Sequence, residues 1–154
     1  MSTAVVTGKT IGLHDEAELQ AGSRASRLAV FVIFTSINRT LKALEKAGQL
    51  ARPLQTGITI LVVQKVHYSL PLDEPPVPFE FVIRHFEEMV DRLPENTRIS
   101  AYVCREPMQA LKRVLKHNCP VVMGVRKRWW PTREERLARK LRRAGYDVIV
   151  VKME

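Results

Sequence analysis

Residues 28–35 read LAVFVIFT, an uninterrupted run of apolar, β-branched and aromatic side chains. The run is too short to form a helix with an apolar face of its own, and it is typical of a strand that is covered on both sides. Strands of this kind occur in parallel sheets, where helical crossovers lie on both faces. This stretch therefore predicts the first strand of a parallel α/β sheet.

Four further apolar runs along the chain have a similar character. GITILVVQKV at 57–66 predicts a second buried strand, and RISAYVCR at 98–105 predicts a third. Two shorter runs follow, PVVMG at 120–124 and DVIVV at 147–151, and they predict the fourth and fifth strands. Helical patterns separate these runs, as they do in parallel sheets.

The first two helical patterns lie on either side of the second strand. Leu41, Leu44 and Ala51 follow helical spacing, and this pattern ends near Pro53. Residues 78–93 carry apolar side chains at positions i, i+3, i+4 and i+7, with charged side chains on the other face. This second pattern is the clearest helical signal in the chain.

The last two helices are marked by residues at their ends. Pro107 opens the third helix, because a proline fits the first turn. Thr132 and Glu135 form a capping box at the start of the fourth helix. Gly145 marks the end of that helix, just before the fifth strand.

Five strands that alternate with four helices predict right-handed crossovers and a Rossmann-like fold. We expect a three-layer α/β sandwich with a five-stranded parallel sheet in the order 3-2-1-4-5, formed by one domain over residues 28–154. Residues 1–27 have no sustained period and predict a flexible arm. Residues 68–78 contain four prolines and predict an extended, exposed linker.

Composition bounds the class of protein. The chain has 154 residues and is 45% hydrophobic, which is enough to form one core without disulfides or structural metals. Cys104 and Cys119 lack the spacing of metal ligands or of a disulfide framework, so we expect reduced, buried thiols. No apolar stretch reaches the roughly 18 residues that span a bilayer, and the N-terminus does not resemble a signal peptide. We expect a soluble, cytoplasmic protein.

Charge is concentrated in one part of the chain. The formal net charge is +9, and residues 126–143 hold nine basic residues against two glutamates. This distribution favours one local electropositive surface. It disfavours a protein whose whole surface is basic and binds nucleic acid.

No motif in the sequence indicates an enzyme. GKT at 8–10 lacks the earlier glycine of a phosphate-binding P-loop, because position 3 is a threonine. The four histidines lie in different elements, without metal-ligand spacing or a carboxylate pair beside them. We therefore expect neither a metal site nor a catalytic centre.

The architecture itself points to a ligand site. In open parallel sheets, ligands bind beyond the carboxyl ends of the strands where the strand order reverses, here between the first and fourth strands. The loops that leave these strands are 35–40 and 124–130. They and the end of the fourth strand supply hydroxyl, amide, glycine and cationic groups as candidate ligands for an anion: Thr35, Ser36, Asn38, Met123, Gly124, Arg126, Lys127 and Arg128.

The second of these loops contains two features of its own. Gly124 is interpreted as the residue that lets the fourth strand turn out of the sheet. Trp129 and Trp130 either cover the crevice or pack under the last helix, and packing is favoured for at least one, since buried indoles contribute a large apolar area.

The order of elements, together with FTSINRTLKALEKA, REPMQALKRVL and PVVMG, resembles the universal stress protein family over residues 28–152. SINRTLKALEKA and RKRWW also resemble the stress-protein-like cytosolic domains of some bacterial amino-acid permeases. The resemblance implies an adenine-nucleotide-hydrolase-like sheet, dimerisation and, in one branch, ATP in the crevice.

The sequence departs from that ATP-binding branch at the positions that hold the nucleotide. The branch has an acidic residue after the first strand and a G-x2-G-x9-G-[ST] loop after the fourth. Here Thr35 stands at the acidic position, Lys127 at the second glycine and Leu137 near the third, and only Gly124 matches. We expect no bound cofactor, with ATP as the one candidate.

Three functions remain open at this point. The leading hypothesis is a non-enzymatic, universal-stress-protein-like binding or regulatory domain with a degenerate nucleotide loop. In the second, Arg and Lys side chains hold a nucleotide or another phosphorylated ligand. The third is a nucleic-acid-binding accessory protein that uses residues 126–143.

Two kinds of partner are expected. The last strand is apolar and lies at a sheet edge, so two copies are predicted to pair there through Val148, Ile149, Val150 and Val151. A small anion or an acidic partner segment is predicted near Arg126, Lys127 and Arg128.

Overall fold

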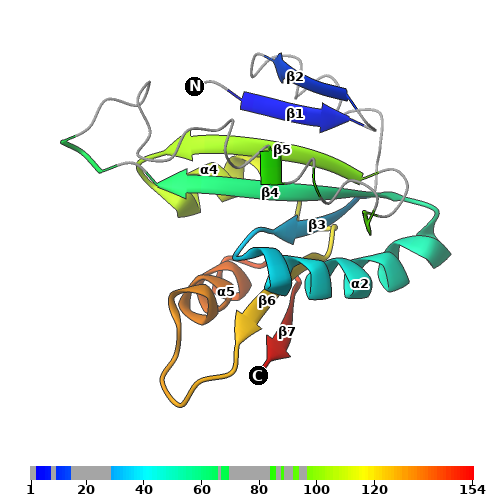
Figure 1. Cartoon of the computed structure of the whole chain (residues 1–154). Coiled ribbons are helices and arrows are strands. Elements are labelled where there is room, and N and C mark those ends of the chain that lie inside the picture. Colours follow the sequence, from blue (N-terminus) through cyan, green and yellow to red (C-terminus); the bar gives the residue numbers. More distant parts are fainter. Residues whose placement is uncertain are drawn as a thin grey trace.

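The computed structural model describes residues 3–7, 10–14, 29–65, 67–69, 84–85, 88, 92–93 and 97–154. Its central feature is a seven-stranded sheet in the order β2-β1-β5-β4-β3-β6-β7 (Figure 1). The strands are β1 (Thr3–Thr7), β2 (Thr10–His14), β3 (Ala29–Ile33), β4 (Gly57–Lys65), β5 (Thr97–Cys104), β6 (Val121–Arg126) and β7 (Val148–Met153). The helices are α2 (Ile37–Leu54), α4 (Pro107–Val114) and α5 (Arg133–Arg143).

The five strands from β3 onward form the predicted sheet. β3 pairs in parallel with β4 on one side and with β6 on the other, β4 pairs with β5, and β6 pairs with β7. Numbered along the chain from β3, these strands have the order 3-2-1-4-5. The predicted fold class is therefore confirmed.

An antiparallel hairpin extends the sheet beyond β5. β1 pairs with β2 and with β5, and its Val5 lies opposite Gly12 on one side and Ser100 on the other. Both strands belong to the segment for which the sequence predicts a flexible arm. Each strand is only five residues long, so its alternation is too short to stand out from the sequence.

Two cores lie on opposite faces of the five parallel strands. Val30 and Val32 of β3 belong to one core, which α2 covers, whereas Phe31 and Ile33 belong to the other, which α4 and α5 cover. Successive side chains of a strand point to opposite faces, so a continuous apolar run supplies both cores at once. This arrangement gives the three layers predicted from residues 28–35.

The helix ends match the signals in the sequence. Pro107 occupies the first turn of α4. At the start of α5, Thr132 Oγ1 accepts a hydrogen bond from the backbone N–H of Glu135 (3.2 Å), and the Glu135 carboxylate accepts one from the backbone N–H of Thr132 (3.3 Å). Gly145 follows α5 with φ of +93°, a conformation that other L-residues rarely adopt.

The predicted helix over 78–93 and the predicted linker over 68–78 lie almost entirely outside the described residues. Within the first, the backbone N–H of Glu88 donates to the carbonyl of Arg84 at 3.1 Å, the bond of one helical turn. At the start of the second, the Tyr68 hydroxyl is exposed and donates to the Glu106 carboxylate at 2.7 Å. No helix in the described part of the chain is long and apolar enough to cross a bilayer.

Candidate functional site

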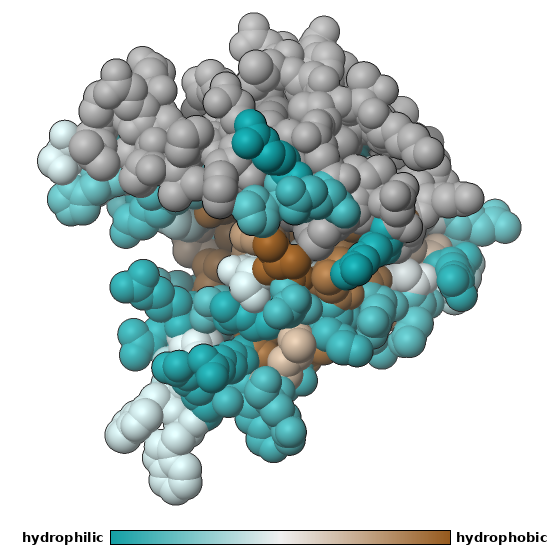
Figure 2. All heavy atoms as spheres, in the orientation of Figure 1, coloured by the Kyte–Doolittle hydropathy of each residue, from teal (hydrophilic) through white to brown (hydrophobic). Residues whose placement is uncertain are grey.

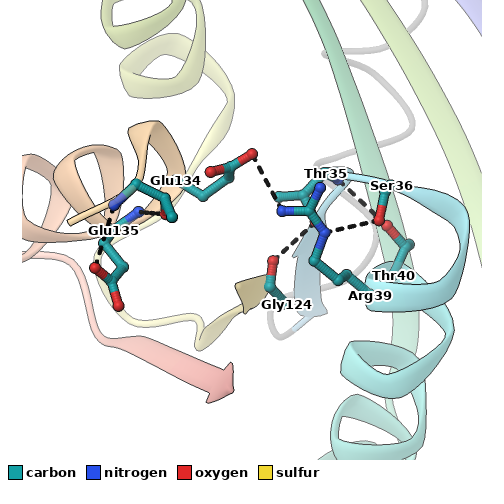
Figure 3. A network of polar contacts seen from close by, with 8 residues as sticks. Thr35, Ser36, Arg39, Thr40, Gly124, Glu134 and Glu135 are labelled. Atoms are coloured by element: carbon teal, nitrogen blue, oxygen red, sulfur yellow. Dashed lines mark hydrogen bonds and ion pairs between the residues drawn. The ribbon is translucent and has the colours of Figure 1, made fainter. Parts of the chain in front are cut away.

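The predicted crevice lies where β3 and β6 separate. Their pairing ends at Ile33 and Met123, and beyond this point the Gly124 carbonyl has no partner on β3. The Thr35 hydroxyl takes that place by donating a hydrogen bond to the Gly124 oxygen at 2.8 Å (Figure 3). The Thr35 side chain thus bridges the gap between β3 and β6 where the strand order reverses. Ligands usually bind at this position.

The first turn of α2 is held by polar contacts of its own residues. Thr40 is fully buried, and its Oγ1 accepts a hydrogen bond from the Thr35 backbone N–H at 3.3 Å. Ser36 is the N-cap of α2, but its hydroxyl forms no capping hydrogen bond to the helix backbone. That hydroxyl instead accepts a hydrogen bond from Nε of Arg39 at 2.8 Å.

Gly124 lies inside β6, so the interpretation that it turns the strand out of the sheet is wrong. It pairs with Val151, and the pairing with β7 continues through Arg126. A Cβ atom at position 124 would overlap the carbonyl oxygen of Arg39 and lie 2.7 Å from the carbonyl carbon. Glycine is therefore required because the backbone of α2 packs directly on β6 at this point.

An ion pair spans the same end of the sheet. Nη1 of Arg39 on α2 lies 3.3 Å from Oε1 of Glu134 in the first turn of α5, and both side chains are about three-quarters buried. Figure 3 shows Glu134 reaching from α5 toward Arg39, next to Thr35 and Gly124. We call Thr35, Ser36, Arg39, Thr40, Gly124 and Glu134 the crevice network.

The environment of Glu134 favours its charged form. Partial burial acts to raise the pKa of Glu134, but hydrogen bonds from its own backbone N–H and from Thr132, together with the Arg39 charge, outweigh burial. The pKa of this carboxyl is therefore lowered, and the ion pair with Arg39 persists well into the acidic range.

The structure brings only some of the predicted ligands together. Thr35, Ser36 and Gly124 belong to the crevice network, whereas Asn38 is exposed on α2. Met123 was predicted to contact a ligand, but it is fully buried in the core beneath α4 and α5. The apolar strand continues through Met123, and its side chain points into that core.

The three predicted cations lie on the surface. Arg126, Lys127 and Arg128 are all exposed. Nζ of Lys127 lies 4.0 Å from the Glu154 carboxylate, and both of these side chains are largely exposed. In the part of the chain that the structure describes, no ion pair engages Arg126 or Arg128.

Three residues of the crevice network were not predicted from the sequence: Arg39, Thr40 and Glu134. Arg39 and Glu134 both resemble ordinary solvated charges near a helix start, and no local pattern shows that they meet. The signal that could have indicated them is the strand-order reversal, since it places the first turns of α2 and α5 at the same end of the sheet.

The preferred interpretation of the tryptophans is also wrong. Trp129 is 93% exposed and Trp130 is 76% exposed, so neither packs under α5. Figure 2 shows the β6–α5 loop as a pale knob that stands out from the lower left of the molecule. Figure 1 shows this loop, between β6 and α5, extending away from the sheet, and both indoles lie in solvent.

Both cysteines are buried, and the described residues contain no metal-binding cluster. Cys104 and Cys119 are free and buried. Burial raises the pKa of the Cys104 thiol, as does the Glu106 carboxylate nearby, so the thiol is kept in its unreactive form. Among the described residues, no group of three His, Cys, Asp or Glu side chains is placed to hold a metal ion.

A hollow of about 910 Å³ runs along α2 from Leu41 to Gln55. Gly48, Arg52 and Gln55 line it, together with Ile58 at the start of β4 and with Arg92. No residue of the crevice network lines this hollow. Comparison with protein-family models and with curated proteins found no match to this chain.

Proposed function

We propose that this chain is a non-enzymatic binding or regulatory domain of the universal-stress-protein kind, in which protein side chains fill the nucleotide crevice. The main support comes from Gly124, the one glycine that matches the nucleotide loop. The α2 backbone at Arg39 occupies the space above it, and Thr35 engages its carbonyl. A phosphate group would have to displace both contacts.

The crevice network supports the proposal electrostatically as well. Backbone nests bind phosphate because several consecutive N–H groups point at one anion. Here a charged pair, Arg39 with Glu134, lies across the same end of the sheet, and Glu134 places a carboxylate there. A triphosphate entering this space would be repelled by the Glu134 carboxylate, and the Arg39 charge that could attract it is already paired with that carboxylate.

A second function is favoured by the free cations after β6. Arg126 and Arg128 are exposed and have no ion-pair partner among the described residues, and the contact of Lys127 with Glu154 is long. Side chains such as these form charge-assisted hydrogen bonds to phosphate without a close backbone approach. A phosphorylated ligand on the loop surface is therefore the alternative.

Calorimetric titration with ATP and magnesium distinguishes the two functions. For the wild-type chain we expect no saturable heat, because the crevice network occupies the site. Lys127→Ala would remove a charge from the loop, and Lys46→Ala on the exposed side of α2 is the matched control. Tight binding that Lys127→Ala abolishes and Lys46→Ala preserves would overturn the proposal of a domain that does not bind nucleotide and would support the second function.

We also infer that the domain pairs with a second copy through β7. This strand ends the sheet order and bonds to β6 along one side only (Figure 1). The carbonyls of Asp147 and Met153 point toward β6, where they accept hydrogen bonds from Val121 and Lys127. Because strand residues alternate in direction, Val148, Val150 and Lys152 direct their backbone groups outward.

Part of that outer edge is already covered. Nε and Nη2 of Arg142 donate to the Val148 carbonyl at 3.1 and 2.8 Å. The groups left for a partner belong mainly to Val150 and Lys152, so the proposed pairing is centred toward the end of β7. This refines the pairing over 148–151 predicted from the sequence.

A further inference from the structure

The β6–α5 loop exposes the only two tryptophans of the chain, next to each other. An indole carries a large apolar ring and usually packs against protein. In the part of the chain that the structure describes, these two rings are left 93% and 76% exposed to water. Adjacent exposed tryptophans on a projecting loop indicate a surface that binds a partner.

Cations flank the two rings on both sides. Arg126, Lys127 and Arg128 precede them, and Arg133 follows after a short turn. The basic surface continues along α5, since its exposed face is opposite the buried Ala138 and Leu141. Residues at i, i+3, i+7 and i+10 make this stripe: Arg133, Arg136, Lys140 and Arg143.

We propose that loop 126–132 docks the protein on a bilayer that carries anionic lipid, with Trp129 and Trp130 inserted at the level of the head groups. Tryptophan is suited to this depth, because its ring is apolar and its N–H can remain hydrogen-bonded. The neighbouring Lys and Arg side chains can extend their apolar stems toward the lipid while their charges contact lipid phosphates.

The shape of the loop favours a bilayer over a single strand of nucleic acid. Proteins that hold single strands combine stacking rings with a basic groove that follows the backbone. Here the loop that carries the rings forms a projecting knob (Figure 2), and helices cover both faces of the five-stranded sheet that could otherwise serve as a platform. A knob fits a soft planar interface better than it fits an extended strand.

Tryptophan fluorescence of the 154-residue chain tests the proposal directly, because its only two tryptophans lie on the loop. Vesicles of phosphatidylcholine and phosphatidylglycerol in equal amounts should shift the emission to shorter wavelength, whereas vesicles of phosphatidylcholine alone should leave it unchanged. Trp129→Phe and Trp130→Phe, studied separately, should each retain a shift from the remaining ring.

Vesicle co-sedimentation measures how much each group contributes. Each cation near an anionic surface strengthens binding by about fivefold. Replacing Arg126, Lys127 and Arg128 together by Gln should therefore weaken binding to the anionic vesicles by about 100-fold. Replacing Trp129 and Trp130 by Ser should weaken it by at least about tenfold. The matched control replaces three exposed cations elsewhere, Lys46, Arg52 and Arg113, by Gln and should bind within about threefold of wild type.

Three results would overturn the proposal. The first is that anionic vesicles neither shift the emission nor sediment the protein. The second is that the tryptophan-to-serine variant binds the vesicles as well as wild type does, because the indole rings would then contribute nothing to membrane binding. The third is that an oligothymidylate quenches the emission while the vesicles leave it unchanged, which would assign the loop to single-stranded nucleic acid.

Discussion

Glycine at position 124 is the residue on which the closed crevice depends. A Cβ atom there would overlap the Arg39 backbone, whereas a Cβ at Gly48, in the middle of α2, would meet nothing within 4 Å. The same substitution should therefore have opposite effects at the two positions. We expect Gly124→Ala to lower the free energy of unfolding by about 2 kcal/mol, as overpacking does.

Gly48→Ala serves as the matched control for this prediction. It should raise the free energy of unfolding by about 0.5–1 kcal/mol, because alanine is the better residue in a helix interior. Urea denaturation followed by circular dichroism measures both changes. Equal stability of Gly124→Ala and wild type would show that α2 does not press on β6 as described.

At the scale of elements, the Arg39–Glu134 pair joins two helices from opposite faces of the sheet. α2 covers one core and α5 the other, so the pair ties the outer layers together at the carboxyl end of the strands. In this position the pair supports the orientation of both helix starts, in addition to the charge that it places in the crevice.

The lowered pKa of Glu134 makes this contribution depend on pH. A carboxyl whose folded-state pKa is depressed stabilises the fold above its unfolded pKa, about 4.3 for glutamate, and loses this effect as pH falls through the folded value. Glu134→Gln should therefore be less stable than wild type at pH 7, by about 0.5–1 kcal/mol. The difference should shrink below about pH 4.3.

Chemical denaturation between neutral and acidic pH measures this difference. Glu45→Gln is a suitable control, because Glu45 pairs with Lys42 on an exposed surface of α2 and should change stability by less than about 0.5 kcal/mol. A gap between wild type and Glu134→Gln that stays constant down to strongly acidic pH would contradict the role of the charge.

For the whole molecule, the main question is how the open edge at β7 is satisfied. Sedimentation velocity at micromolar concentration should show a dimer. Val150→Pro removes an outward N–H without breaking a bond to β6, so it should give a folded monomer. Val151→Pro is the control: it removes a bond to β6 and should destabilise the fold itself by about 3 kcal/mol. A strictly monomeric wild-type chain would contradict the pairing.

How much of this molecule is readable from its sequence depends on the range of the interactions. The five parallel strands were predictable because a continuous apolar run is a local feature of the sequence, and so was the capping box of Thr132 with Glu135. The pair of Arg39 with Glu134 was not, since the two residues meet only through the strand order. Gly124 was misread for the same reason: the backbone that requires it lies in a distant helix.

The exposure of Trp129 and Trp130 was missed for a different reason. Burial is the usual state of an indole, so a rule based on apolar area assigns both rings to the core. What overrides the rule is the path of the loop, which leads away from the sheet before α5 begins. Departures of this sort are expected at surfaces that serve a function.

The β1–β2 hairpin also sets an order of events during synthesis. Val5 pairs with Ser100, so the partner strand of β1 is made about 95 residues later. At ordinary ribosomal speeds this delay is roughly 5–20 s, far longer than a hairpin needs to form. β1 and β2 can therefore join the sheet only after β3, β4 and β5 have been synthesised.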